Sequence, residues 1–191
     1  MAVGRMAFDD TLVEQLKGGQ SVAYSKLVER FEGPLYRFFL CDHRNHHLAE
    51  EQTAETFAQL VQSLPAMRGG AAQLRAYIFS TARHVQLRRW RRREERPSTL
   101  AEAMDLRDPG PTPENLADMR EQAGRALKAI GLLDDQARQV LFLRFVEGCS
   151  IDEIGQAMEI PVGTVKSHIS RGRARLKSIL ANEEYNHDGT R

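Results

Sequence analysis

Apolar residues recur at every third or fourth position through most of this chain, and this spacing constrains the fold more than any other feature of the sequence. In an α-helix such spacing gathers apolar side chains on one face. The pattern runs from Phe8 to about Arg96 and returns from Leu116 to Leu180. No stretch has the strict alternation and turn punctuation of β-strands. The sequence therefore predicts an all-α protein.

Between the two helical stretches the apolar periodicity fades and prolines gather. These prolines are Pro97, Pro109, Pro111 and Pro113. Together with a glycine and several acidic residues, they are typical of an interdomain linker that is part extended and part mobile. We expect two small helical domains joined by a flexible linker. The predicted boundaries are 1–96 for the first domain, 97–117 for the linker, 118–181 for the second domain and 182–191 for a polar tail.

Several classes of protein are excluded by what the sequence lacks. No apolar run approaches the roughly 18 residues that span a bilayer, and the N-terminus lacks the apolar core of a signal peptide, so we expect a cytoplasmic protein. Cys41 and Cys149 lie far apart in apolar surroundings, which predicts buried thiols and no disulfide framework. The nearby histidines, His43, His46 and His47, fit no established metal-ligand spacing. The sequence contains no cluster of carboxylates of the kind that would indicate an enzyme. We expect no cofactor and no small-molecule substrate.

Positive charge is concentrated in two segments, although the formal net charge of the whole chain is only +1. Residues 71–96 hold eight arginines and two glutamates, and residues 161–191 hold six basic and three acidic residues. Two basic segments separated by acidic stretches indicate two contacts with a polyanion.

The second basic segment contains PVGTVKSHISRGRARLK, residues 161–177, with five basic residues and no acidic one. Ser150 and Glu153 precede it with the spacing of a capping box, which predicts a short helix and then a tight turn. One face of the basic helix is apolar and is expected to pack: Val165, Ile169, Gly172, Leu176, Ile179 and Leu180. The opposite ridge is small: Ser167, Ser170, Ala174 and Ser178. This division is typical of a helix-turn-helix recognition helix, whereas a merely solvated helix usually mixes both signs of charge.

About fifty residues, LLDDQARQVLFLRFVEGCSIDEIGQAMEIPVGTVKSHISRGRARLKSIL, resemble region 4 of bacterial extracytoplasmic-function (ECF) sigma factors, and GTVKS followed by RGRARL is the most specific part. The resemblance implies that this domain reads the minus-35 promoter element. The residues implied in DNA binding there are Thr164, Lys166, Ser167, Ser170, Arg171 and Arg173. His168 stands where the family usually has arginine, and Glu159 where it commonly has glycine.

The N-terminal half carries two further resemblances. LAEEQTAETFAQLVQSL is similar to sigma region 2.2, which docks on the polymerase β′ subunit. This resemblance implies that polymerase is bound by Glu50, Glu51, Glu55 and Phe57. Ala54 stands where the family usually has glutamine. LRAYIFSTARHVQLRRWRRR resembles regions 2.3 and 2.4, which recognise and open the minus-10 element, and implies DNA binding by Arg83, His84, Arg88 and Arg91. The loop at about 65–73 would hold a flipped base, and Tyr77 is expected in the core.

The combined resemblance implies an ECF sigma factor that binds core RNA polymerase (β′ and β subunits) and promoter DNA and directs promoter-specific transcription initiation. Such factors are commonly controlled by an anti-sigma factor, often membrane-bound, which would hold the protein at the inner membrane. The alternative is a LuxR-like helix-turn-helix regulator that acts on duplex DNA without docking on polymerase. The region 2 patterns favour the sigma factor.

Overall fold

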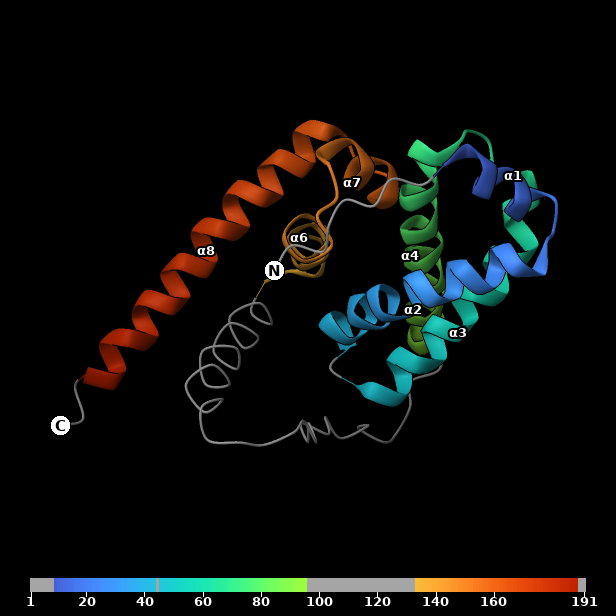
Figure 1. Ribbon diagram of the computed structural model, residues 1–191. Coiled ribbons are helices and arrows are strands. Elements are labelled where there is room, and N and C mark those ends of the chain that lie inside the picture. The colour runs from blue at the N-terminus through green and yellow to red at the C-terminus, as the bar shows by residue number, and fades with distance from the viewer. Residues whose placement is uncertain (1–8, 44, 96–132, 189–191) are drawn as a thin grey trace, which may run out of the picture.

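The computed structural model describes residues 9–43, 45–95 and 133–188. The helices are α1 (Asp10–Lys17), α2 (Ser21–His43), α3 (His46–Ser63), α4 (Ala71–Glu95), α6 (Asp135–Leu141), α7 (Ile151–Met158) and α8 (Val162–Asp188), with a 3₁₀ turn η1 (Leu64–Ala66) and a π-helical turn η3 (Phe142–Val146). Every one of these elements is helical (Figure 1), which confirms the all-α prediction for this part of the chain. No helix within it is both long and apolar enough to cross a membrane.

The breaks between the N-terminal helices fall at capping residues and at glycines. Asp9 caps α1 by accepting a hydrogen bond from the Leu12 amide at 2.7 Å, and Gly19, with a φ of 72°, follows the end of that helix. Asn45 caps α3 in the same way. Gly69, with a φ of 99°, precedes α4. Glycine adopts these left-handed angles without the steric cost that a Cβ imposes, so the helix ends are fixed locally.

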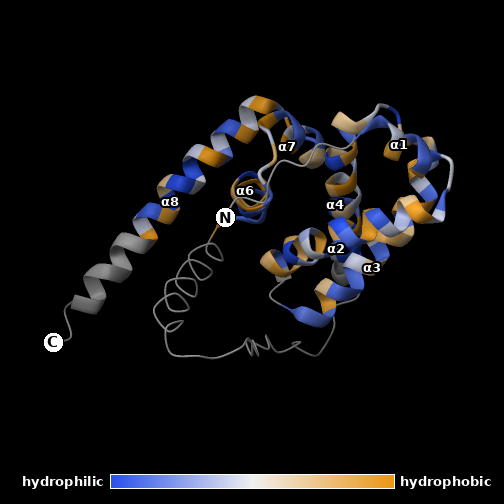
Figure 2. Cartoon of the chain, in the orientation of Figure 1, coloured by the Kyte–Doolittle hydropathy of each residue, from blue (hydrophilic) through white to orange (hydrophobic). Residues whose placement is uncertain are grey.

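The N-terminal helices α1 to α4 pack around a core of aromatic and aliphatic side chains. Figure 2 shows apolar and hydrophilic residues alternating in bands along these helices. Phe38, Phe39 and Phe79 are almost completely buried. The Phe79 ring lies 6.3 Å from that of Phe31 and 5.7 Å from that of Phe38. Because buried aromatic rings each remove a large apolar area from water, this cluster stabilises the packing of α2 against α4.

The C-terminal helices form the predicted helix-turn-helix. Ser150 and Glu153 make the expected capping box at the start of α7, with each side chain bound to the other residue's backbone amide. The apolar residues between 134 and 146 predict a single, largely buried helix, but this segment instead forms α6 and the π-helical turn η3. Within that turn Arg144, Phe145 and Val146 are exposed, and Phe145 is 58% exposed.

The N-terminal and C-terminal helices share one large apolar core, and a second, smaller cluster of Leu133, Ala137 and Leu141 packs against α8. Helix α7 packs along α4, and α6 packs on α2. The rings of Phe38 and Phe142 meet across this contact with centroids 6.0 Å apart. The predicted linker at 97–117 lies outside the described residues, and the domain boundaries stay a prediction.

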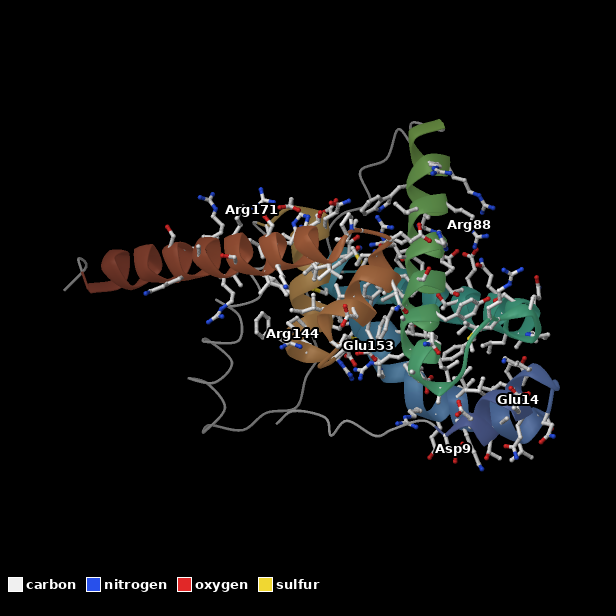
Figure 3. The ribbon with its side chains drawn as sticks, turned by 90° about the horizontal axis from the view of Figure 1, so that it is seen from above. Asp9, Glu14, Arg88, Arg144, Glu153 and Arg171 are labelled. Atoms are coloured by element: carbon white, nitrogen blue, oxygen red, sulfur yellow. The ribbon has the colours of Figure 1, made fainter. Side chains whose placement is uncertain are left out.

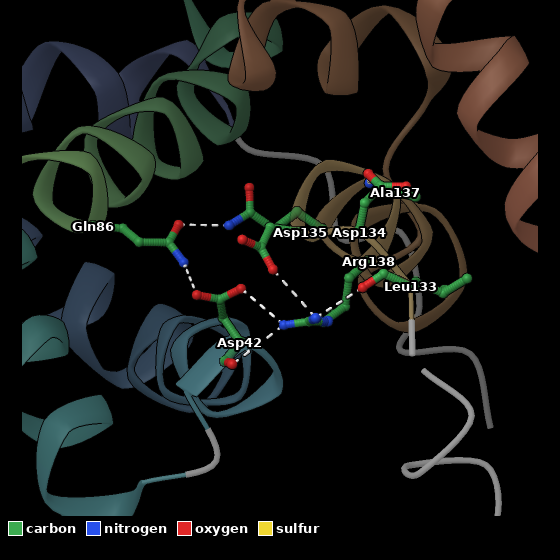
Figure 4. Close-up of polar contacts among 8 residues, drawn as sticks. Asp42, Gln86, Leu133, Asp134, Asp135, Ala137 and Arg138 are labelled. Atoms are coloured by element: carbon green, nitrogen blue, oxygen red, sulfur yellow. Dashed lines mark hydrogen bonds and ion pairs between the residues drawn. The ribbon is translucent and has the colours of Figure 1, made fainter. Parts of the chain in front are cut away.

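A polar network lies within the same contact (Figure 4). Arg138 of α6 pairs with Asp42 of α2 at 3.1 Å. Gln86 of α4 donates to the other Asp42 carboxylate oxygen and accepts a hydrogen bond from Gln139. Arg138 also donates to the Leu133 carbonyl oxygen at 2.9 Å. These side chains are nearly inaccessible, and their mutual hydrogen bonds offset the cost of burying them.

Asp42 makes the stability of the protein depend on pH. Burial raises the pKa of its carboxyl to about 6, and the Asp135 carboxylate adds to the rise, while Arg138 and Gln86 oppose it. An unfolded aspartate has a pKa near 3.9, so the folded state binds this proton more tightly. The stabilising contribution is therefore fully present below about pH 4 and is lost as the pH rises through 6.

We expect the free energy of unfolding of the wild type, minus that of Asp42→Asn, to fall by on the order of 2 kcal/mol between pH 4 and pH 6.5 and then to level off. Urea denaturation of both proteins across this range measures the difference. A difference that does not change with pH contradicts the raised pKa.

Candidate nucleic-acid interface

One face of α8 packs on the helices behind it, as the sequence predicts. Val165 is completely buried, and Ile169 and Leu176 are half-buried against α6. Gly172 is buried where α8 packs on α6, and a Cβ there would lie only 2.7 Å from Leu141 Cδ1. The close packing of the two helices thus favours glycine at this position, and the packed face fixes which side of α8 faces outward.

The outward side of α8 is basic and small. Lys166, Ser170, Arg171 and Arg173 are exposed, and Thr164 and Ser167 are half-buried near the start of the helix. Figure 3 shows Arg171 projecting from the outer side of α8. Arg173 lies with its guanidinium 6.0 Å from the centre of the exposed Phe145 ring, a cation–π distance. The six predicted minus-35 residues therefore share one helix, and four of them are exposed.

The turn between α7 and α8 depends on a strained residue. Glu159 adopts a left-handed conformation with φ 52° and ψ 43°, and it is the one non-glycine residue with positive φ in the described chain. A side chain in this region costs roughly 1 kcal/mol relative to glycine. The Glu159 carboxylate also lies 3.1 Å from His84 Nε2 of α4. Glu159, which stands where the family commonly has glycine, therefore preserves the geometry of the turn and adds a contact to α4.

The basic side of α4 carries the predicted minus-10 residues. His84, Arg88 and Arg91 are exposed, and Arg83 is half-buried. Tyr77 packs against the core, as expected. On the neighbouring helix α3, Glu50 and Glu51 are exposed, while Glu55 and Phe57 are half-buried and Phe57 packs against the core.

The acidic side of α3 and the basic side of α4 lie against each other, which the sequence does not indicate. Arg88 lies 3.4 Å from Glu55, and Arg89 lies 3.1 Å from Glu51. Both pairs are well exposed to solvent, and such pairs contribute about 1 kcal/mol or less. Glu51 and Glu55, which are predicted to bind polymerase, are thus each paired with an arginine of α4. One of these arginines, Arg88, is a predicted minus-10 residue. Because both ion pairs are weak, another partner can replace either residue at little cost.

Helix α1 holds the loop that precedes α4, a role that the sequence analysis missed. The Ala71 amide donates to Asp10 Oδ1 at 2.8 Å, and Lys17 Nζ donates to the Gly69 carbonyl oxygen at 3.0 Å. A side chain at Gly70 would displace this carboxylate, because its Cβ would lie 2.4 Å from the same Asp10 oxygen. The sequence does not indicate this arrangement, because Asp10 and Ala71 are 61 positions apart. The two hydrogen bonds fix the loop, and Arg68 within it is exposed.

The cysteines and histidines form no metal site in the segments that the structure describes. His46 Nδ1 is hydrogen-bonded to the Tyr36 hydroxyl. Cys149 is buried as expected, and burial raises the pKa of its thiol to about 12. Cys41 is only half-buried, contrary to expectation, since it lies at the edge of the contact between α2 and η3.

The fold and the two basic helices define a DNA-binding protein in which a helix-turn-helix is combined with a second, separate basic helix. The Sigma-70, region 4 family matches residues 123–176. The chain is 30% identical over 175 residues, covering 90% of this chain and 67% of the relative, to the ECF RNA polymerase sigma factor SigE of Mycolicibacterium smegmatis. The chain belongs to the ECF RNA polymerase sigma factors of the sigma-70 family. Members of this family act in transcription initiation and are not enzymes.

Two solved structures share the fold. The structure of CnrH in complex with the cytosolic domain of CnrY superposes with a TM-score of 0.68 at 21% identity, covering 91% of this chain and 97% of that one. The sigma factor RpoE of Bartonella quintana, in complex with the anti-sigma factor NepR, superposes with a TM-score of 0.66 at 20% identity, covering 83% of this chain and 96% of that one. Family membership excludes the LuxR-like alternative.

The close approach at Gly172 makes a testable prediction about α8. Gly172→Ala forces the Leu141 side chain to move; overpacking of this kind costs about 1–3 kcal/mol of stability, and the higher helix propensity of alanine offsets about 1 kcal/mol of that cost. Gly163→Ala is the matched control on the same helix, because nothing lies within 4 Å of the Cβ that it adds; it should be neutral or stabilise by up to about 1 kcal/mol. Urea denaturation compares the two, and equal effects would show that α8 does not approach α6 in this way.

Proposed function

We propose that this sigma factor binds core RNA polymerase through α3, reads the minus-35 element with α8, and recognises and opens the minus-10 element with α4 and the loop before it. The observation that carries the proposal is the exposure of two basic helices on separate parts of one chain, with an acidic helix beside one of them. The proposed domains are 1–96 for polymerase binding and minus-10 recognition, 97–117 for the linker, and 118–181 for minus-35 recognition.

At the minus-35 element, α8 enters the major groove with its outward side. Ser170 and the neighbouring Ala174 are exposed and small, so the helix can approach the base edges closely. Lys166 and Arg171 then reach bases, while Arg173, on the side of α8 nearest Phe145, reaches a phosphate. Thr164 and Ser167 act at the start of the helix, where backbone amides and side chains position a protein on the duplex.

At the minus-10 element, Arg83, His84, Arg88 and Arg91 track the backbone of the separating strands. Arginines along an exposed helix suit this task, because most of the affinity for single-stranded DNA comes from charge and stacking. The loop held by Asp10 and Lys17 of α1 supplies a rigid edge against which a flipped base can be held, and its position is fixed before DNA arrives.

Docking on polymerase uses Glu50, Glu51, Glu55 and Phe57. A basic surface on the β′ subunit can replace Arg88 and Arg89 as the partner of Glu55 and Glu51, because these exposed pairs are weak. That exchange releases the arginines toward DNA beside the docking site. Polymerase binding and minus-10 binding would therefore reinforce each other.

Control by an anti-sigma factor is the third part of the proposal. RpoE of Bartonella quintana was solved with the anti-sigma factor NepR, and CnrH with the cytosolic domain of CnrY. A protein of this class that covers α3 and the DNA-binding helices would keep the present factor inactive. The proposed location is the cytoplasm, or the inner membrane where such a partner is membrane-bound.

A reconstituted transcription assay with core polymerase tests the proposal as a whole. We expect purified protein and core polymerase together to start RNA synthesis at specific promoters of the source genome, whereas neither does so alone. Absence of core binding, or absence of any promoter-specific transcript, contradicts it.

Two arginines on α8 should behave differently when each is replaced by alanine. Arg171→Ala removes a base contact, so it should cost about 1–3 kcal/mol and relax selectivity at one minus-35 position. Arg173→Ala removes a phosphate contact, so binding should weaken about equally on all sequences and the salt dependence should drop by about one ion. Titration of holoenzyme on a set of single-base promoter variants at several salt concentrations separates the two. If both variants lost selectivity equally, the assignment of the groove-facing side of α8 would be wrong.

The acidic side of α3 should matter for polymerase but not for duplex DNA. The double variant Glu51→Ala, Glu55→Ala should weaken core binding at least tenfold, because two charges that face the β′ subunit are lost. Glu29→Ala, an exposed acid on α2, is the matched control and should bind core normally. Core affinity is measured by fluorescence anisotropy, and a double variant that binds core as tightly as the wild type refutes the assignment.

A further inference from the structure

The loop between η1 and α4 carries one long exposed side chain, that of Arg68. Met67, which precedes it, is only 5% exposed and packs in the core, and the two residues that follow it are Gly69 and Gly70. Arg68 itself is exposed. Among the residues that the structure describes, its guanidinium has no hydrogen-bond or ion-pair partner. Any side-chain contact between residues 67–70 and DNA must therefore come from Arg68.

The backbone polar groups next to the two glycines are already hydrogen-bonded within the chain. In each case the partner is a side chain of α1 or α4. These bonds join the Ala71 amide to Asp10 Oδ1 at 2.8 Å, the Gly69 carbonyl oxygen to Lys17 Nζ at 3.0 Å, and the Gly70 amide to Gln73 Oε1 at 3.0 Å. Because a bond to DNA would have to replace one that already exists, these groups gain little from it. Recognition by this loop therefore falls to a side chain.

Helix α1 restrains the backbone from which Arg68 projects. This helix lies beside η1 and the start of α4 (Figure 1), and its residues Asp10 and Lys17 bind the chain just after Arg68. Met67 is buried on the other side. Consecutive glycines have much conformational freedom to lose, and these contacts remove it before DNA arrives. Pre-organisation of this kind lowers the entropy lost when a contact forms.

A guanidinium restricts which bases Arg68 can read. It carries five N–H donors and no acceptor, and it binds two neighbouring acceptors at once. Guanine presents O6 and N7 as such a pair, and cytosine presents O2 and N3 once its pairing edge is free. Adenine instead places an amino donor beside N7. A flipped guanine or cytosine therefore fits this side chain better than adenine.

We propose that Arg68 is the specificity-determining residue of this loop, which reads a flipped guanine or cytosine of the minus-10 element, and that Asp10 and Lys17 are positioning residues that act through it. The inference rests on the proposed function, in which this loop holds the flipped base. It adds which side chain reads that base and which bases it accepts. It also gives α1 a part in promoter selectivity.

Initiation by holoenzyme on promoters that carry each of the four bases at each minus-10 position tests the base contact. For the wild type we expect guanine or cytosine to be favoured over adenine by about tenfold at one position. Arg68→Ala should reduce this preference to less than about threefold and leave the other positions and core affinity unchanged. Lys26→Ala, which removes an exposed cation of α2, is the control and should keep the wild-type preference.

A double-mutant cycle tests the positioning role of α1. Asp10→Ala removes the acceptor of the Ala71 amide and should lower the base preference nearly as far as Arg68→Ala does. Asp10→Asn keeps a side-chain oxygen that can accept this hydrogen bond, so it should restore the preference. In an Arg68→Ala background, Asp10→Ala should change the preference no further, whereas a merely structural effect would persist. Thr11→Ala, at an exposed position of the same helix, is the control.

Several results in a wild type that initiates at specific promoters overturn the inference and leave the proposed function intact. The base-reading role fails if no minus-10 position favours guanine or cytosine, or if Arg68→Ala keeps the preference. It also fails if Arg68→Ala slows initiation equally on all four bases, because that assigns the guanidinium to a phosphate. The positioning role fails if Asp10→Ala lowers the preference further in the Arg68→Ala background. A wild type that neither binds core nor initiates overturns the proposed function, and both roles with it.

Discussion

The packing of α7 against α4 is the contact on which the rest of this structure depends. Helix α4 contributes buried residues to the N-terminal core, supports the helix-turn-helix through α7, and keeps its basic residues on the remaining side. Because one helix serves all three purposes, its rotation is strongly constrained. The apolar residues that fix this rotation also determine which arginines are exposed and which acids of α3 they meet.

Much of the fold can be predicted from the sequence, because the determinants are local. The caps at Asp9, Asn45 and Ser150 are short-range hydrogen bonds between residues three apart, and the packed face of α8 follows directly from the spacing of Val165, Ile169 and Gly172. The exposure of Phe145 is different. It follows from a π-helical turn that apolar periodicity cannot distinguish from a regular helix, because the pattern counts residues and not hydrogen bonds.

The candidate site is predictable where residues act along one helix and unpredictable where they meet across helices. Spacing and charge indicate that α8 and α4 are each basic on one side, and the resemblance to sigma regions 4 and 2 supplies the individual positions. The pairing of Glu55 with Arg88, the support of the loop by Asp10, and the burial of Asp42 with Arg138 join residues 33, 61 and 96 positions apart. Charge alone cannot indicate which of 27 basic and 26 acidic residues will be neighbours. Through these contacts, acidic residues proposed to bind polymerase pair with basic residues proposed to bind DNA. The molecule is therefore more than two independent DNA-binding units.

The central claim is that one chain reads two distant promoter elements with α8 and α4. It is tested most directly by cleavage of promoter DNA from an iron chelate attached to single cysteines, one at Ser178 on α8 and one at Arg92 on α4, in the polymerase-bound protein. The account predicts two separate cleavage centres about 25 base pairs apart, near minus-35 from α8 and near minus-10 from α4. Cleavage from both positions at the same place, or cleavage from only one of them in active holoenzyme, would contradict it.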